Sequence, residues 1–274
     1  MKGVVMPFLA AERKNLLDLK EEHWRPPVYS GIPSPVSRVK NFVYLFLDLQ
    51  ASTIARDLRR ELPRAKGDVL DVGCGTQPYR GWFAADARYT GIDIADSKNH
   101  FGYEAPDTLY YSGPSWPVKS RSTDFILCTE TLEHVEEPLV FLKEAARVLR
   151  PRGKVLLTVP FAARWHFIPY DYWRYTPSGL EALLKKAGFE KVEIYARGNQ
   201  FTVACYKIMG FFFALLSPVV SEGWLKIPLI GLGILGLPLL LIAAILANLS
   251  KGVDGSVDCL GYTVLAQRSS AKAR

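Results

Sequence analysis

Cysteine is scarce in this sequence, and the four cysteines lie far apart along its 274 residues. None of them stands in a C-x-x-C pair or at a metal-ligand spacing from a histidine, which argues against a disulfide framework and a zinc site. We therefore expect a reducing compartment and no bound metal. The segment MKGVVMPFLAAERK has only a short apolar run before charges resume, so we expect no signal peptide.

Net charge is absent from the middle of the chain. Basic residues outnumber acidic ones by 12 to 7 in residues 1–66 and by 4 to 2 in residues 250–274, whereas residues 67–249 hold 18 of each. A nucleic-acid-binding protein would concentrate basic charge on one face among stacking aromatics, so we expect no nucleic-acid partner. Basic flanks fit the cytoplasmic side of an anionic membrane, with a merely solvated basic surface as the alternative.

Strand-like and helix-like segments alternate through the centre of the chain. Short apolar runs predict strands at residues 68–72, 89–94, 108–112, 124–129, 153–161 and 189–196. Apolar spacing and capping signals predict helices over residues 8–24, 36–62, 78–86, 137–149 and 177–186. Strands that alternate with helices form a parallel sheet covered on both faces, so the sequence predicts an α/β, Rossmann-like fold.

A glycine-containing turn follows the first predicted strand, in the stretch VLDVGCGTQPY. Gly73 and Gly75 allow the backbone to pass close to a ligand where a side chain would block it. The dinucleotide pattern G-x-G-x-x-G needs a third glycine where Pro78 stands, and no G-K-[ST] follows, so a nicotinamide cofactor and a P-loop are disfavoured. Asp93 ends the second predicted strand, where its carboxylate could accept both hydroxyls of a ribose.

The D-x-G-C-G motif at residues 71–75 and the L-E-H-V motif at residues 132–135 resemble those of class I S-adenosylmethionine-dependent methyltransferases. The resemblance covers about 67–200 and 259–268. It implies a seven-stranded, mostly parallel sheet with an antiparallel last strand, and S-adenosylmethionine as cofactor. Gln77 departs from the group, which usually has a third glycine there. The residues that the resemblance places around the cofactor are Asp71, Gly73, Cys74, Gly75, Asp93, Tyr111, Ser112, Thr129 and Glu130.

Two histidines follow predicted strands on the side of the sheet expected to bind the cofactor. His134 lies in TETLEHVEEP, and His166 lies in RWHFIPYDYWRYT. Either imidazole could act as a general base near neutral pH when the acceptor is a hydroxyl. The alternatives are that His134 only hydrogen-bonds its own loop and that His166 only packs beside Trp165.

An aromatic loop follows the fifth predicted strand, and loops of this kind on a rigid sheet often carry function. Its arginines could clamp a phosphate or carboxylate of the acceptor. In the resembled group, a similar P-x-D-Y-W-R-x-T stretch lies beside the acceptor pocket. The alternative is an aromatic plug over the core, stapled by an Asp171–Arg174 pair. The candidate acceptor-binding residues are Arg164, Tyr170, Asp171, Trp173 and Arg174.

The stretch Ile227–Leu249 carries no charge over 23 residues. As a helix it would measure about 34 Å, enough for a hydrocarbon core of about 30 Å. The strand-like segment 259–268 that follows is the candidate for the antiparallel last strand, so residues 201–250 form an insertion whose two ends lie on one side of any membrane. We expect a membrane-associating hairpin and slightly favour a bent, monotopic one over two full spans. A soluble, buried dimerisation hairpin is the alternative.

These observations predict four parts: a basic, helical extension at 1–66, a methyltransferase domain at 67–200 with 257–268, a hydrophobic hairpin at 201–250 and a basic tail at 269–274. We expect an enzyme at the cytoplasmic face of the cell membrane. It would methylate a hydroxyl or amine of a lipid-linked, glycan or quinone-type acceptor. A membrane-docked module without turnover and a methyltransferase of a soluble small molecule stay open as alternatives. The oligomeric state is open as well.

Overall fold

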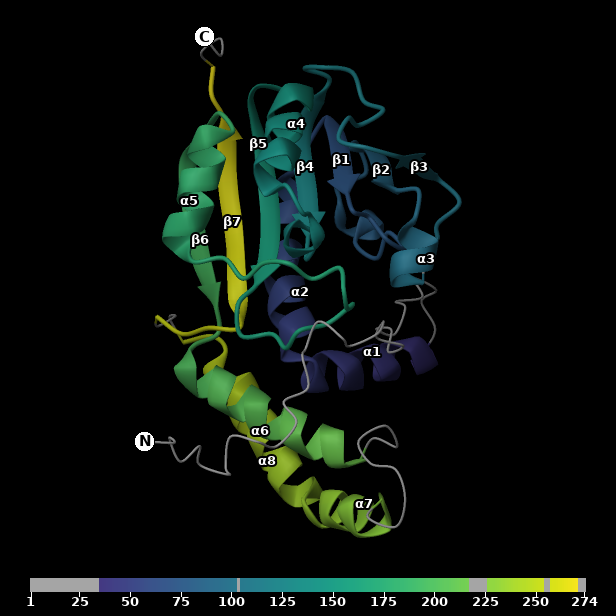
Figure 1. The fold of residues 1–274 in the computed structure, drawn as a ribbon, viewed down its shortest axis with the longest axis vertical. Coiled ribbons are helices and arrows are strands. Elements are labelled where there is room, and N and C mark those ends of the chain that lie inside the picture. The colour runs from purple at the N-terminus through teal and green to yellow at the C-terminus, as the bar shows by residue number, and fades with distance from the viewer. Residues whose placement is uncertain (1–34, 103, 217–225, 254–256, 271–274) are drawn as a thin grey trace, which may run out of the picture.

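The computed structural model describes residues 35–102, 104–216, 226–253 and 257–270. The helix expected over 8–24 and most of the proline-rich segment after it lie outside these residues. A single seven-stranded sheet with the order β3-β2-β1-β4-β5-β7-β6 organises the chain (Figure 1). Its strands are β1 (Asp68–Val72), β2 (Arg88–Ile94), β3 (Thr108–Tyr111), β4 (Thr123–Thr129), β5 (Leu149–Pro160), β6 (Phe189–Arg197) and β7 (Gly261–Arg268).

The last strand returns to the sheet after the apolar insertion. Strand β7 lies between β5 and β6 and is antiparallel to both. Val264 pairs with Leu157 on one side and with Ile194 on the other. The other neighbouring strands run parallel, so the predicted Rossmann-like fold with an antiparallel closing strand is confirmed.

Helices cover both faces of the sheet. On one face, α4 (Pro138–Val148) and α5 (Pro177–Lys186) pack over the main apolar core. Thr176 caps α5, its side chain accepting a hydrogen bond from the Gly179 backbone at 3.2 Å, as the Thr-Pro sequence predicts. On the other face, Ile54 and Leu58 of α2 (Leu49–Glu61) join a second cluster with residues of β1, β4 and β5.

The helix predicted over 78–86 does not form. The segment contains only the short 3₁₀ turn η4 (Arg80–Trp82), between Pro78 and turns at Ala84–Ala87. The sheet face that this helix would cover is occupied instead by α2, and Trp82 and Phe83 pack against the apolar cluster that α2 forms with β1, β4 and β5. Three further short elements, η3 (Leu62–Arg64), α3 (Ser97–Phe101) and η5 (Leu132–His134), were not predicted.

The single helix predicted over 36–62 is two helices. Asp48 has extended backbone angles, and its side chain accepts a hydrogen bond from the Ala51 backbone at 2.9 Å. It therefore caps α2 and separates it from α1 (Pro35–Leu47), which runs across the end of the sheet (Figure 1). The apolar spacing continues through both helices, so it did not reveal the break.

The insertion forms helices that project beyond the sheet (Figure 1). They are α6 (Gln200–Leu216), α7 (Lys226–Leu235) and α8 (Leu237–Ser250). At the base of the insertion, Met209 packs with Ala243, Ala244 and Ala247, and Leu49 of α2 joins this cluster. Among the described helices, none alone is long and apolar enough to cross a membrane. Helices α7 and α8 together reach that length and apolar composition, but they are bent by 49° where they meet.

Candidate functional site

The turn after β1 depends on glycine in its backbone conformation. Gly73 and Gly75 have φ values of 68° and 52°, in the left-handed region that glycine enters without strain. A Cβ on Gly73 would also collide with the side chain of Thr131. Cys74 contributes only backbone here, because its thiol is buried and lies 3.5 Å from the hydroxyl of Thr108.

Two carboxylates from neighbouring strands flank this turn. Asp93 Oδ2 accepts a hydrogen bond from the Gly75 backbone at 2.9 Å, and Oδ1 accepts one from the Ile94 backbone at 2.8 Å. Asp71 Oδ2 accepts from the Tyr89 hydroxyl at 2.7 Å, while its Oδ1 is buried with no partner among the described residues. Burial raises the pKa of Asp71 to about 7; the Tyr89 hydrogen bond opposes that rise, and Asp93 adds to it.

A cavity of about 470 Å³ opens in front of these groups. Gly73 and Asp93 line it at one end, and Thr129 and Glu130 line it at the close of β4. Ser112 is not among its lining residues. Tyr111, a predicted cofactor-site residue, lines the cavity. Its wall also includes Gly113, Trp116 and Phe141, which were not predicted from the sequence.

This cavity fits S-adenosylmethionine. It has the size of a small-molecule site, the Asp93 carboxylate in its lining for ribose hydroxyls, and an apolar wall for a base. Behind the lining, Asp71 keeps a buried oxygen without a partner among the described residues. The glycine turn leaves backbone exposed where the methionine part is predicted. When bound, this cofactor supplies a methyl group on a positively charged sulfur.

Glu130 is held at the border of the cavity by a buried arginine. Its backbone N–H donates to the Thr158 carbonyl at 3.0 Å, and its φ is 45°. The fully buried Arg197 donates to Glu130 Oε1 at 2.8 Å and to the Val159 carbonyl at 3.1 Å. The sequence analysis missed Arg197, because an arginine at the end of a strand gives no signal that it turns inward.

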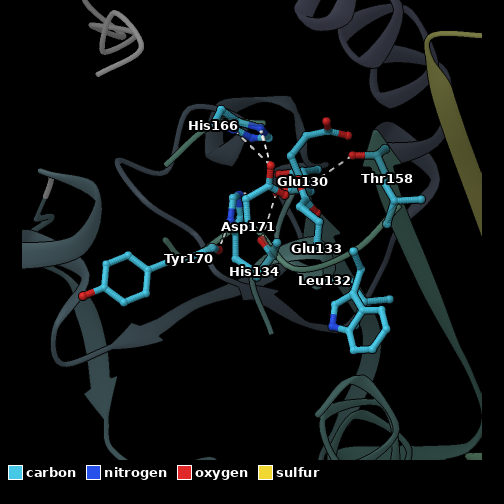
Figure 2. Close-up of polar contacts among 12 residues, drawn as sticks. Glu130, Leu132, Glu133, His134, Thr158, His166, Tyr170 and Asp171 are labelled. Atoms are coloured by element: carbon cyan, nitrogen blue, oxygen red, sulfur yellow. Dashed lines mark hydrogen bonds and ion pairs between the residues drawn. The ribbon is translucent and has the colours of Figure 1, made fainter. Parts of the chain in front are cut away.

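The two candidate bases lie close together. The ring centroids of His134 and His166 are 5.2 Å apart, and Figure 2 shows both rings beside Asp171. His134 Nδ1 lies 2.6 Å from the Tyr170 carbonyl oxygen, so this nitrogen carries the proton and donates. Burial lowers the pKa of His134 to about 4, which makes its imidazole neutral near pH 7 and a weak base.

The aromatic loop is fastened by its own charged residues. Asp171 accepts two hydrogen bonds from Arg174, at 2.6 and 2.7 Å, and one from the His166 backbone at 3.1 Å. Arg174 also donates to the Arg164 carbonyl at 2.8 Å, and the Trp173 indole donates to the Val135 carbonyl at 2.9 Å. The Asp171–Arg174 ion pair therefore holds the loop in its conformation.

A second cavity, of about 350 Å³, lies on the other side of the glycine turn. Of the candidate acceptor-binding residues, Arg164 lines it, and so does the candidate base His166. Tyr170, Asp171, Trp173 and Arg174 are not among its lining residues. Its wall also includes residues of α1, α2, α6 and the glycine turn. The residues that line both cavities are Gly73, Thr129, Glu130 and His134.

Comparison with known proteins identifies related sequences. An uncharacterised methyltransferase of Mycobacteroides abscessus is 36% identical over 99 residues, which is 33% of this chain and 38% of that protein. The 27-O-demethylrifamycin SV methyltransferase of Amycolatopsis mediterranei is 32% identical over 133 residues, 44% of this chain and 45% of that one. The chain therefore spans less than half the length of these two relatives.

Solved structures share the fold. A chain in the complex between the Haloferax volcanii Trm112 methyltransferase activator and a methyltransferase has a TM-score of 0.50 at 14% identity, with 88% of this chain and 100% of that chain covered. The profile of a methyltransferase domain family matches residues 47–194, more than half of the chain. The protein therefore belongs to this methyltransferase domain family.

Proposed function

We propose that this methyltransferase works at the cytoplasmic face of a membrane and methylates a hydroxyl or amine of a lipid-linked acceptor. The observation that carries the proposal is the position of the second cavity. It meets the predicted cofactor cavity at Gly73 and Glu130, and its outer wall includes Tyr44 of α1 and Tyr206 of α6. An acceptor there would lie between the methyl donor and the two helices that carry the exposed apolar surface.

The outward sides of those helices support a lipid partner. Phe42 on α1 and Phe211 on α6 are 71% and 58% exposed. A large apolar side chain moved from water into hydrocarbon contributes roughly 1.5–3 kcal/mol, so a continuous set of them favours a bilayer over water. The other large, exposed apolar residues of these helices and of α7 and α8 are Val39, Val43, Phe201, Ile208, Phe213, Ile227, Leu232, Ile234, Leu235, Leu237, Leu239, Leu241, Ile242, Ile245, Leu246 and Leu249.

The helix lengths support a monotopic hairpin. Helix α6 has 17 residues and so measures roughly 26 Å, which is less than the thickness of a hydrocarbon core. The 49° bend between α7 and α8 shortens the reach of the other arm. An insertion of this shape fits one leaflet better than a hydrocarbon core of about 30 Å. Lys207 donates to the Ala162 carbonyl at 2.6 Å, toward the domain rather than into the insertion.

The transfer itself is an in-line displacement. The acceptor atom forms a bond to the methyl carbon, the carbon–sulfur bond breaks, and its electron pair returns to sulfur. A hydroxyl acceptor must also release its proton. The protein contributes alignment of the two cavities and exclusion of water from their junction. The O-methyltransferases among the relatives, such as the ubiquinone biosynthesis enzyme of Cereibacter sphaeroides, support an oxygen acceptor.

Labelled S-adenosylmethionine tests the proposal. The purified chain is supplied with the methyl-labelled cofactor and with either a lipid extract in vesicles or an aqueous extract of the same cells. We expect label in the organic phase, and Asp93→Asn should remove most of it, which excludes a contaminating enzyme. Label confined to the aqueous extract would rule out a lipid-linked acceptor.

A further inference from the structure

Three ligand-type side chains converge beside the junction of the two cavities. One possible ligand atom from each of Glu133, His134 and His166 lies within 4.8 Å of the other two. His134 lines both cavities and His166 lines the second, so the group borders the space predicted for the acceptor. Figure 2 shows these side chains meeting from η5 and from the loop after β5.

The protonation of His134 leaves a lone pair pointing into this group. Because Nδ1 donates to the Tyr170 carbonyl, a neutral ring has no proton on Nε2. Nε2 lies 3.7 Å from Glu133 Oε1, which is too long for a hydrogen bond. A backbone carbonyl on the far nitrogen is the arrangement that commonly orients a metal-ligating histidine.

Glu133 differs from the neighbouring acidic residues in having no arginine partner among the described residues. Asp171 pairs with Arg174 at 2.6 Å, and Glu130 pairs with Arg197 at 2.8 Å. Glu133 is completely buried, and neither carboxylate oxygen has a hydrogen-bond partner among the described residues. A buried carboxylate without a partner is costly, and either a proton or a cation must compensate it.

We propose that Glu133, His134 and His166 bind a divalent transition-metal cation. Two ligands at about 2.1 Å from a tetrahedral metal lie roughly 3.4 Å apart, close to the spacing of 3.7 Å between Glu133 Oε1 and His134 Nε2. Two imidazoles and one carboxylate are a ligand set that such cations accept, and the side facing the second cavity stays open.

An open coordination position gives the cation a role toward the acceptor. A coordinated hydroxyl loses its proton to water more easily, and the resulting oxygen attacks the methyl carbon as described above. This role rests on the proposed function and selects hydroxyl over amine acceptors; the cation site itself does not rest on it. No metal was expected from the sequence because ligands at short spacing are lacking, whereas His166 comes from a different loop.

Cobalt absorption tests the site without any acceptor. The purified full chain, stripped with chelator, is titrated with Co²⁺, whose visible absorption reports coordination by protein ligands. We expect saturation at one equivalent. Glu133→Gln and His166→Gln should each weaken Co²⁺ binding at least tenfold. The matched controls Glu136→Gln, an exposed acid beside the cluster, and His100→Gln, outside it, should bind as the parent does.

Three results would overturn the proposal. They are no visible absorption with Co²⁺, equal binding by the parent and by both cluster variants, or a strong sulfur-to-metal band that places Co²⁺ on a cysteine. Circular dichroism of each variant separates loss of the site from loss of the fold. Because the titration needs neither S-adenosylmethionine nor an acceptor, a positive result alongside failed lipid labelling would reject the proposed function and keep the cation site.

Discussion

The replacement of Asp93 by asparagine tests the predicted cofactor site. The carboxylate already accepts hydrogen bonds from the Gly75 and Ile94 backbones, and its remaining lone pairs face the cavity. Asparagine keeps the shape but removes the charge and turns one acceptor into a donor. Hydrogen bonds to a charged group are worth about 1 kcal/mol more than neutral ones.

In Asp93→Asn, two hydrogen bonds to the ribose are weakened, and the amide N–H₂ group faces a backbone N–H. Together these changes should cost about 2–3 kcal/mol of binding free energy. The dissociation constant for S-adenosylhomocysteine should therefore rise roughly 30- to 150-fold, since about 1.4 kcal/mol corresponds to a factor of ten. Isothermal titration calorimetry measures it directly. The control is Asp107→Asn, an exposed acid paired with Arg80, which should leave the affinity unchanged. A change of less than threefold in folded Asp93→Asn protein would refute the assignment of Asp93 to the ribose.

Three further changes test other parts of the structure. Gly261→Ala would drive a Cβ into Arg197 and a backbone carbonyl, so the urea midpoint should fall by the equivalent of about 2–3 kcal/mol; an unchanged midpoint would contradict this packing. Burial raises the pKa of Asp71 above its unfolded value, so the folded state holds a proton that the unfolded state releases. The apo protein should therefore lose about 2 kcal/mol of stability between pH 5 and 7, and Asp71→Asn should flatten that slope; an equal slope in both proteins would show otherwise. The double change Phe211→Glu and Ile242→Glu should reduce binding to anionic phosphatidylglycerol vesicles at least tenfold, measured by flotation. Unchanged flotation would show that the hairpin does not contact the membrane.

The sequence predicts the sheet well because each strand carries its own local signal. The continuous apolar run of β5 and the Thr-Pro cap of α5 are recognisable without knowing which other segments they contact. The position of β7 follows from the family resemblance. The helix expected at 78–86 does not form; its aromatic residues Trp82 and Phe83 instead pack against the apolar cluster of α2, β1, β4 and β5. The break at Asp48 is set by one cap inside an unbroken apolar pattern.

The site residues also fall into those with a local sequence signal and those that depend on distant contacts. Asp71, Gly73 and Asp93 could be predicted as site residues because motif and strand end coincide in the sequence, and in the structure all three lie at the glycine turn. Arg197 was not predicted, since its burial depends on contacts of its side chain with Glu130, with Val159 of β5 and with Gln50 of α2. The orphaned carboxylate of Glu133 is likewise visible only when its surroundings are assembled.

The central claim is that this enzyme methylates an acceptor held at a membrane. Mass spectrometry of lipid extracts from cells with and without the chain tests it most directly. The account predicts one membrane lipid or lipid-linked glycan that loses a single methyl group when the chain is removed and regains it when the parent sequence, but not Asp93→Asn, is restored. An unchanged lipid fraction, with the missing methyl group found in a water-soluble metabolite, would contradict it.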